Sequence, residues 1–310
     1  MAPVPASRGA APVIETNGLT KYFGPHRGVE DLTLAIRQGE VLGFLGPNGS
    51  GKTTAIRMLM GFLRPSRGGA TIFGLDVVRD SQQIKRRVGY LPGEVALYGG
   101  STGRELLSFV MQIRGLREAP RALEVASLLD VEMDRPNKKC SRGMRQKIAL
   151  VLTLAHDPDL LILDEPTSGL DPLAQRALLG LLDRLAGEGK TVFFSSHILS
   201  EAEQICDRVA ILRRGQLVAL SPVEDLRERK YKEVTIAFQG PPPRLVGLED
   251  AEVIWQHEGR MTFRVRGDAN ALLAFLRNCD LSDVSIAEPS LEDVFLDYYR
   301  EGEPGEDAHS

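Results

Sequence analysis

The residues with the clearest capacity for chemistry lie in the stretch 46–54, Gly-Pro-Asn-Gly-Ser-Gly-Lys-Thr-Thr. Its glycines can adopt backbone conformations that a side chain would penalise, so that backbone N–H groups can turn inward around phosphate oxygens. Lys52 can reach the terminal phosphates of a nucleotide, and the hydroxyl of Thr53 can bind Mg²⁺. An apolar run before the stretch and a helical pattern after it give the strand–loop–helix context in which this motif indicates a nucleotide site. We therefore predict that the phosphates are bound by Gly46, Pro47, Asn48, Gly49, Ser50, Gly51, Lys52, Thr53 and Thr54.

Two acidic residues follow a second apolar run, where the predicted strand 159–164 ends. Asp164 has the position of a second Mg²⁺ ligand in phosphate-loop NTPases, and Glu165 beside it could act as a general base toward an attacking water. His197 follows another buried strand, 191–195. Because parallel strands present their carboxyl ends at one edge of a sheet, where ligands bind, we expect His197 at the same site. The pattern predicts Lys52, Glu165 and His197 as catalytic residues, and Thr53 and Asp164 as metal ligands.

Composition limits the class of protein. Of the 310 residues, 43% are hydrophobic and 26% are charged, which is typical of a soluble globular protein. A net charge of −4 does not favour a nucleic-acid partner, since such proteins usually carry a basic excess. The three cysteines are odd in number and far apart, which indicates a reducing compartment. With no apolar run long enough to span a bilayer and no signal-peptide pattern, we expect a cytoplasmic protein that reaches a membrane only through a partner.

The elements that must position these residues alternate between strands and helices, which predicts an α/β fold over residues 13–230. Strands are expected at 13–16, 28–37, 41–45, 70–73, 88–91, 159–164, 191–195, 208–212 and 216–220. The aromatic stretch 21–24 would then lie between the first two strands. Three successive helices at 102–114, 118–130 and 141–155 interrupt the alternation, so we predict a helical subdomain inserted at about 93–156. Thr102 and Glu105 have the spacing of a capping box at the start of the first of them.

The pattern changes after residue 221. Ser221 and Glu224 have capping-box spacing and predict a basic helix to about Lys230. Half-exposed strands at 233–238, 253–256, 261–265 and 282–287, with helices at 269–277 and 290–299, predict a separate small α+β domain over 231–300. The two ends of the chain, 1–12 and 301–310, are expected to be disordered.

Taken together, these residues resemble the ATP-binding subunit of ABC transporters over about residues 13–220. The resemblance is carried by the two nucleotide motifs at 46–54 and 160–165, a signature segment at 140–144, a dimer loop at 168–171 and a switch histidine at His197. It implies an ATPase in which two ATP molecules are held between two subunits arranged head to tail. Each ATP would contact the phosphate loop of one subunit and the signature segment of the other. The resemblance adds Tyr22, stacked on adenine, and Ser141, Gly143 and Asp171 to the residues expected to bind nucleotide.

Two departures from the family pattern are visible. The signature segment is usually Leu-Ser-Gly-Gly-Gln, so Cys140, Arg142 and Met144 differ. At the position of a glutamine that contacts Mg²⁺ in the family stands Gly93, followed by Glu94, and either Glu94 or water would take that role. The form of the stretch 90–94 and the closing stretch 291–295 look most like ATPases of bacterial drug and antibiotic export systems. The cofactors implied are ATP and Mg²⁺, and the partner implied is a separate integral-membrane permease at the inner face of the cell membrane.

Two alternatives remain open at this point. A soluble ABC-type ATPase acting on nucleic acid or ribosomes would usually show two ATPase cores or a long coiled coil, and neither pattern is present. A nucleotide-gated scaffold without hydrolysis is disfavoured by the presence of Glu165 and His197. The permease is expected to dock near 93–100, where Val95, Leu97 and Tyr98 stand among glycines, unless these side chains pack internally.

Overall fold

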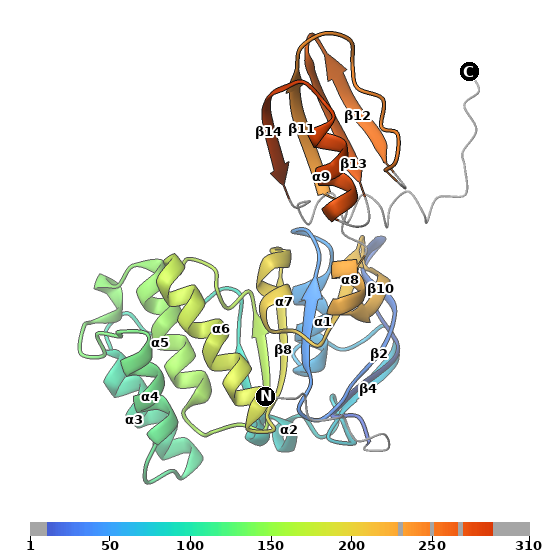
Figure 1. Ribbon diagram of the computed structural model, residues 1–310. Coiled ribbons are helices and arrows are strands. Elements are labelled where there is room, and N and C mark those ends of the chain that lie inside the picture. The colour runs from blue at the N-terminus through green and yellow to red at the C-terminus, as the bar shows by residue number, and fades with distance from the viewer. Residues whose placement is uncertain (1–10, 229–231, 249–250, 266–268, 288–310) are drawn as a thin grey trace. The chain divides into compact units, whose positions relative to one another are not determined.

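The computed structural model describes residues 11–228, 232–248, 251–265 and 269–287 (Figure 1). The predicted helix 290–299 and acidic tail 301–310, and most of the predicted N-terminal segment 1–12, lie outside the described residues. The chain divides into two compact units between Ser221 and Pro222, and each unit is described by itself. The described helices include none long and apolar enough to cross a membrane.

A six-stranded sheet forms the centre of the first unit. Its strands lie in the order β10-β9-β3-β8-β7-β6, and the adjacent strands from β9 to β6 in this order pair in parallel. Every residue of β3, β7 and β8 is buried, because the sheet is covered on both faces, and this explains their near-continuous apolar sequences. The strands are β3 (Val41–Leu45), β6 (Val88–Leu91), β7 (Leu160–Asp164), β8 (Thr191–Ser196), β9 (Arg208–Arg213) and β10 (Gln216–Pro222).

A second, antiparallel sheet packs against the first through helix α1 (Lys52–Leu59). Its strand order is β2-β1-β4-β5, with β1 (Ile14–Phe23), β2 (His26–Ile36), β4 (Arg67–Ile72) and β5 (Leu75–Asp76). One hydrophobic core contains buried residues of both sheets and of α1. The predicted first strand, 13–16, ends too early, and Tyr22 lies within β1 rather than between strands. The pairing of β1 with β2 shifts register after Thr16, where Gly18 has φ 57°, so the apolar alternation is lost although the strand continues.

The helical insert lies between β6 and β7. It contains α3 (Gly103–Arg114), α4 (Pro120–Leu128), a 3₁₀ turn (Asn137–Lys139) and α5 (Arg142–Leu154), whereas α2 (Ser81–Arg87) precedes β6. The helices of the insert stand together at one side of the unit (Figure 1). The predicted capping box forms: Glu105 N donates to Thr102 Oγ1 at 3.2 Å, and Thr102 N donates to Glu105 Oε2 at 2.8 Å.

Helices α6 (Pro172–Gly187) and α7 (Leu199–Ile205) pack against each other and against the six-stranded sheet. Asp171 caps α6, since its Oδ1 accepts a hydrogen bond from Ala174 N at 2.9 Å. Each of these helices begins a few residues after a strand of the sheet, α6 after β7 and α7 after β8. The strand–helix connections therefore all reach the same edge of the sheet.

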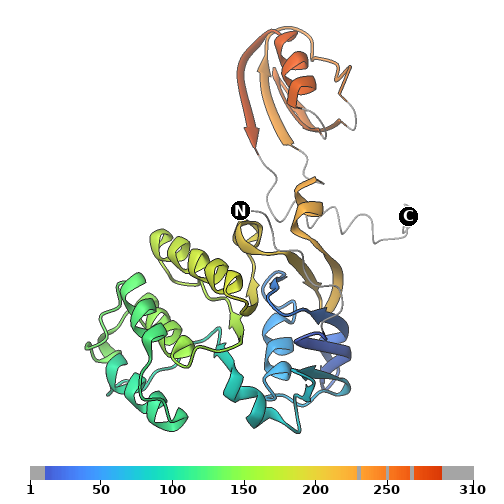
Figure 2. The same cartoon turned by 60° about the horizontal axis from the view of Figure 1, so that its bottom comes forward.

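The second unit is a four-stranded antiparallel sheet with α9 (Ala269–Arg277) across one face (Figure 2). Its strand order is β12-β13-β11-β14, with β11 (Lys232–Phe238), β12 (Glu252–His257), β13 (Arg260–Val265) and β14 (Leu281–Ala287). Leu272 and Phe275 of α9 join its core. The capping box predicted at Ser221 is wrong, because Ser221 belongs to β10 and its buried Oγ has no hydrogen-bond partner among the described residues. Helix α8 (Val223–Glu228) begins two residues later.

His156, which follows α5, makes the stability of the first unit depend on pH. Burial, together with the nearby positive charge of Arg114, lowers the pKa of His156 from 6.5 to about 4. The unfolded chain therefore binds a proton at this residue between pH 6.5 and about 4 that the folded chain does not bind. Stability should be fully present above pH 6.5 and fall as the pH drops toward 4.

We expect His156→Gln to reduce this loss of stability at low pH. The slope of unfolding free energy against pH should fall by an amount equivalent to the binding of up to about one proton. Urea unfolding between pH 7 and 4 measures the slope. His26→Gln, at the exposed start of β2, is the matched control for replacing a histidine by glutamine. Parallel curves for the wild type and His156→Gln would show that burial of His156 does not perturb its titration.

Candidate nucleotide site

The carboxyl ends of the parallel strands bring the predicted site residues together. The pairing registers place Leu45 beside Ser196 and Asp164 beside Ser195. The phosphate loop follows β3, Glu165 follows β7 and His197 follows β8, so all three connections leave one edge of the sheet. This is where the topology of an open parallel sheet places a ligand site.

The phosphate loop requires glycine at two of its positions. Gly51 has φ 107°, and a Cβ atom there would lie 2.4 Å from Gly28 O. A Cβ atom on Gly46 would lie 2.3 Å from Leu212 O. A side chain at either position would force the backbone apart. The loop borders a cavity of about 180 Å³ lined by Arg27, Gly28, Asn48, Gly49, Gly51, Lys52, Thr53, Thr54 and Glu165.

Lys52 is held inside its own loop. Its side chain is only 5% exposed, and Nζ lies 3.7 Å from Glu165 Oε1. Nζ donates to Gly46 O at 2.6 Å and to Pro47 O at 3.2 Å. Burial lowers the pKa of Lys52, whereas the negative charges of Glu165 and Asp164 act in the opposite direction. A largely buried ammonium in this setting can neutralise a phosphate oxygen at low cost, because most of its desolvation has occurred on folding.

Asp164 and Glu165 are fixed by a serine on the neighbouring strand. Ser195 Oγ donates to Asp164 Oδ1 at 2.6 Å and accepts from Glu165 N at 3.0 Å. Asp164 is 1% exposed, and its Oδ2 has no hydrogen-bond partner. Glu165 has φ 48°, a left-handed conformation that is uncommon outside glycine and that recurs at functional sites.

Glu165 lies between two basic groups. His197 Nδ1 is 3.4 Å from Glu165 Oε1, the same oxygen that faces Lys52, and the His197 side chain is 46% exposed. The buried amide of Gln146 donates to Glu165 O at 3.4 Å and to Pro166 O at 3.1 Å, which holds the backbone at this point. Ser195 and Gln146 were not identified from the sequence. For Ser195, the feature visible in the sequence was a pair of serines at the end of an otherwise apolar strand. For Gln146, it was a glutamine on the apolar face of α5.

The donor set fits Mg²⁺. A buried carboxylate oxygen without a partner, Asp164 Oδ2, is costly unless a donor or cation faces it. Thr53 lines the cavity of the phosphate loop, and one carboxylate with a hydroxyl, phosphates and water is a common environment for this ion. A Cβ atom on Gly93 would lie 3.1 Å from Asp164 Oδ2, so residue 93 adjoins the same oxygen. Glu94, the following residue, is exposed.

Tyr22 is anchored beside the cavity rather than in its lining. Its hydroxyl donates to the carboxylate of Glu30, and this hydrogen bond raises the pKa of the Tyr22 hydroxyl. Arg27 is paired with Tyr22 across the β1–β2 hairpin and does line the cavity, together with Gly28. Sequence reasoning missed Arg27 and Gly28, because only the hairpin register brings them to the phosphate loop.

The residues predicted to serve a second nucleotide lie elsewhere in the same chain. Ser141 caps α5, accepting from Met144 N at 3.2 Å. A Cβ atom on Gly143 would lie 2.4 Å from Gly169 O, which packs the signature segment against the dimer loop. Asp171 pairs with Lys147 at 3.4 Å. Ser141, Gly143 and Asp171 are absent from the lining of the phosphate-loop cavity, so the structure does not bring them to the nucleotide site of their own chain.

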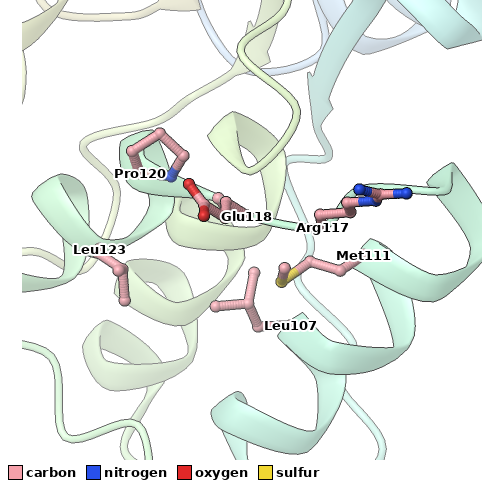
Figure 3. Close-up of a pocket in the computed structure, with 7 residues that line it drawn as sticks. Leu107, Met111, Arg117, Glu118, Pro120 and Leu123 are labelled. Carbon is pink, nitrogen blue, oxygen red and sulfur yellow. The ribbon is translucent and has the colours of Figure 1, made fainter.

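A larger cavity of about 330 Å³ lies in the helical insert, away from the nucleotide residues. Figure 3 shows Leu107 and Met111 of α3 and Leu123 of α4 around it, with Glu118 and Pro120 at the start of α4. Its lining contains none of the residues predicted to bind nucleotide or metal. It is an apolar depression on the surface of the insert.

The fold and the site define a phosphate-loop ATPase. A family model described as ABC transporter matches residues 29–168. BcrA, a bacitracin transport ATP-binding protein of Bacillus licheniformis, is 36% identical over 301 residues, covering 92% of this chain and 96% of that protein. The solved structure of an ATP-binding subunit of an ABC transporter matches with 32% identity and a TM-score of 0.65, over 69% of this chain and 92% of that one.

A dimeric ATP-binding cassette in a post-hydrolysis state, bound to ADP and Pi, shares the fold with a TM-score of 0.62 at 23% identity, over 68% of this chain and 98% of that one. The chain belongs to the ABC transporter family, as an ATP-binding subunit, and its activity is ATP hydrolysis.

Proposed function

We propose that two copies of this chain enclose two ATP molecules and that their hydrolysis drives export through a separate integral-membrane permease. The observation that carries the proposal is the convergence at one sheet edge of Lys52, Asp164 and Glu165, with Glu165 Oε1 also 3.4 Å from His197 Nδ1. Under this proposal, Lys52 would supply a cation for the phosphates, Asp164 a metal ligand, Glu165 a base and His197 its polar partner.

Each residue has a distinct role in the proposed reaction. Lys52 exchanges its hydrogen bonds to the loop carbonyls for oxygens of the β- and γ-phosphates. Water attacks the γ-phosphorus, its proton passes to Glu165, and the bond to the bridging oxygen breaks to release ADP and phosphate. His197, whose Nδ1 lies 3.4 Å from Glu165 Oε1, would donate a hydrogen bond to the γ-phosphate. Asp164 Oδ2 and the Thr53 hydroxyl would hold Mg²⁺, which supplies positive charge to the phosphates when bound.

The dimer is supported by the placement of the signature segment. Ser141, Gly143 and Asp171 do not line the phosphate-loop cavity of their own chain, which leaves them available to a nucleotide held by another copy. Tyr22 is proposed to stack on the adenine ring beside Arg27, its partner across the hairpin. The similarity to BcrA, named for bacitracin transport, favours an exported drug or antibiotic as cargo. A net charge of −4 gives no support to the alternative of a nucleic-acid or ribosome partner.

The permease would hold the chain at the inner face of the membrane, and we place part of its contact on the segment 93–100. Tyr98 is 82% exposed, whereas Val95 and Leu97 are half-buried. Asn137 Nδ2 donates to Tyr98 O at 3.0 Å, so the backbone is fixed while the ring is free. Gly93 at the start of the segment adjoins Asp164, which links the proposed contact to the nucleotide site.

We expect replacement of Leu97 and Tyr98 by serine to reduce membrane recruitment and transport at least about tenfold in cells that carry the cognate permease, because an aromatic anchor is lost. ATPase activity of the purified chain should be unchanged. The control is Val246→Ser, which removes a side chain with 77% exposure from the second unit. Recruitment and transport that survive the double substitution would place the contact elsewhere. The Glu165→Gln variant, which should lose ATP turnover, shows separately how far transport falls when hydrolysis is blocked.

A further inference from the structure

The signature segment and the dimer loop of one chain form a single packed unit. Arg142 is the first residue of α5, and its Nη2 donates to Ser168 Oγ at 2.9 Å. The stem of the same side chain covers Gly169, since a Cβ atom there would lie 3.4 Å from Arg142 Cγ. On the other side, Gly169 O is so close to Gly143 that a Cβ atom would stand 2.4 Å from it. The dimer loop is thus enclosed by two consecutive residues of the signature segment.

Besides Arg142, two side chains hold the last two residues of the dimer loop: Lys147 pairs with Asp171 at 3.4 Å, and Gln175 Nε2 donates to Leu170 O at 3.2 Å. The backbone hydrogen bonds of its first three residues are local: Ser168 N donates to Glu165 O at 3.1 Å and Leu170 N donates to Thr167 O at 3.1 Å, both to residues just before the loop. Gly169 has φ 77°, so its backbone has access to many other conformations. The hydrogen bond and the stem of Arg142 limit this freedom from outside the loop. Glycine, the usual family residue at position 142, has no side chain with which to make either contact.

We propose that Arg142 is a positioning residue that fixes the dimer loop onto the signature segment, so that both meet the partner copy as one rigid surface. The proposal rests on the ATP-enclosing dimer of the proposed function. The dimer would then form with less loss of loop entropy, because the loop is ordered before the partner arrives. The same loop begins three residues after Glu165, so its position also bears on the general base.

A different role for Arg142 would be a cation aimed at the partner's nucleotide. The two roles differ in what Ser168 contributes. In the proposed positioning role, which we call the clamp, the hydrogen bond needs both Arg142 and Ser168. Removing the Ser168 hydroxyl should therefore have the same effect as removing the Arg142 guanidinium. A phosphate-binding cation needs only its charge, and Ser168 would then be dispensable.

The test uses Arg142→Met, Ser168→Ala and the double variant in the Glu165→Gln background, with the dimer dissociation constant measured in Mg-ATP. Each single substitution should weaken the dimer about threefold to tenfold, in line with the net contribution of one exposed hydrogen bond. The double variant should be no weaker than the worse single variant, because both remove the same interaction. ATP affinity of the monomer should stay unchanged. An unaffected dimer in Ser168→Ala, or additive losses in the double variant, would overturn the clamp.

Hydrogen exchange in the nucleotide-free monomer separates this inference from the proposed function. The amides of Ser168 and Leu170 should exchange about threefold to tenfold faster in both single variants, whether or not the chain dimerises. If the Glu165→Gln protein does not dimerise in ATP, the proposed ATP-enclosing dimer is wrong. The hydrogen-exchange result then tests the clamp by itself. Exchange at these amides that is unchanged in Arg142→Met would contradict the clamp directly.

Discussion

Lys52→Ala is expected to lower the affinity for Mg-ATP at least about a hundredfold, corresponding to about 2.7 kcal/mol. Lys52 is the cation that the phosphate loop itself supplies to the cavity, and its Nζ is already desolvated and oriented by Gly46 O and Pro47 O. Its removal leaves the β- and γ-phosphate charge without that partner in a partly buried site, which costs more than losing an exposed ion pair. Isothermal titration calorimetry measures the change.

The matched control for Lys52 is Lys85→Ala. Lys85 lies on α2 with its ammonium 4.4 Å from the ring centroid of Phe62, outside the lining of the phosphate-loop cavity. Its removal should leave nucleotide affinity unchanged. A Lys52→Ala protein that binds Mg-ATP within about threefold of wild type, a difference under about 0.7 kcal/mol, would refute the assignment of the phosphate site.

Glu165→Gln is expected to retain ATP binding but to lose turnover by about a hundredfold or more, because the amide cannot accept the proton of the attacking water. The substitution preserves the shape of the side chain and keeps an oxygen for His197. Steady-state phosphate release gives the rate, and calorimetry checks that the nucleotide still binds. Glu118→Gln is the control, since Glu118 is an exposed carboxylate in the helical insert, away from the nucleotide residues. Near-normal turnover in Glu165→Gln would move the base to His197 or Glu94.

Sequence reasoning succeeded where a residue's position follows from sheet topology. The strand 41–45 and the strand ending at Asp164 are apolar throughout because both faces of the sheet are covered, and that pattern is visible without a structure. The meeting of Lys52, Glu165 and His197 follows from the rule that parallel strands share a carboxyl edge. A local signal also sufficed for the cap at Thr102.

Sequence reasoning did not reach contacts that depend on tertiary packing. Gln146 meets Glu165 O only because α5 packs back toward the end of β7. Arg27 and Gly28 enter the cavity through a hairpin whose register is altered by bulges. The capping pattern at Ser221 is present in the sequence, but strand pairing continues through this residue and displaces the start of the helix. Such competition between a local signal and sheet pairing is settled only by the whole fold.

The central claim is that ATP itself joins two copies of the chain, and the Glu165→Gln protein tests it most directly because it binds ATP without consuming it. Light scattering should give the mass of one 34.0 kDa chain without nucleotide and in Mg-ADP. In saturating Mg-ATP it should give the mass of two chains, and Lys52→Ala combined with Glu165→Gln should abolish the shift. A protein that stays at the mass of a single chain in Mg-ATP, while calorimetry shows its site filled, would contradict the account.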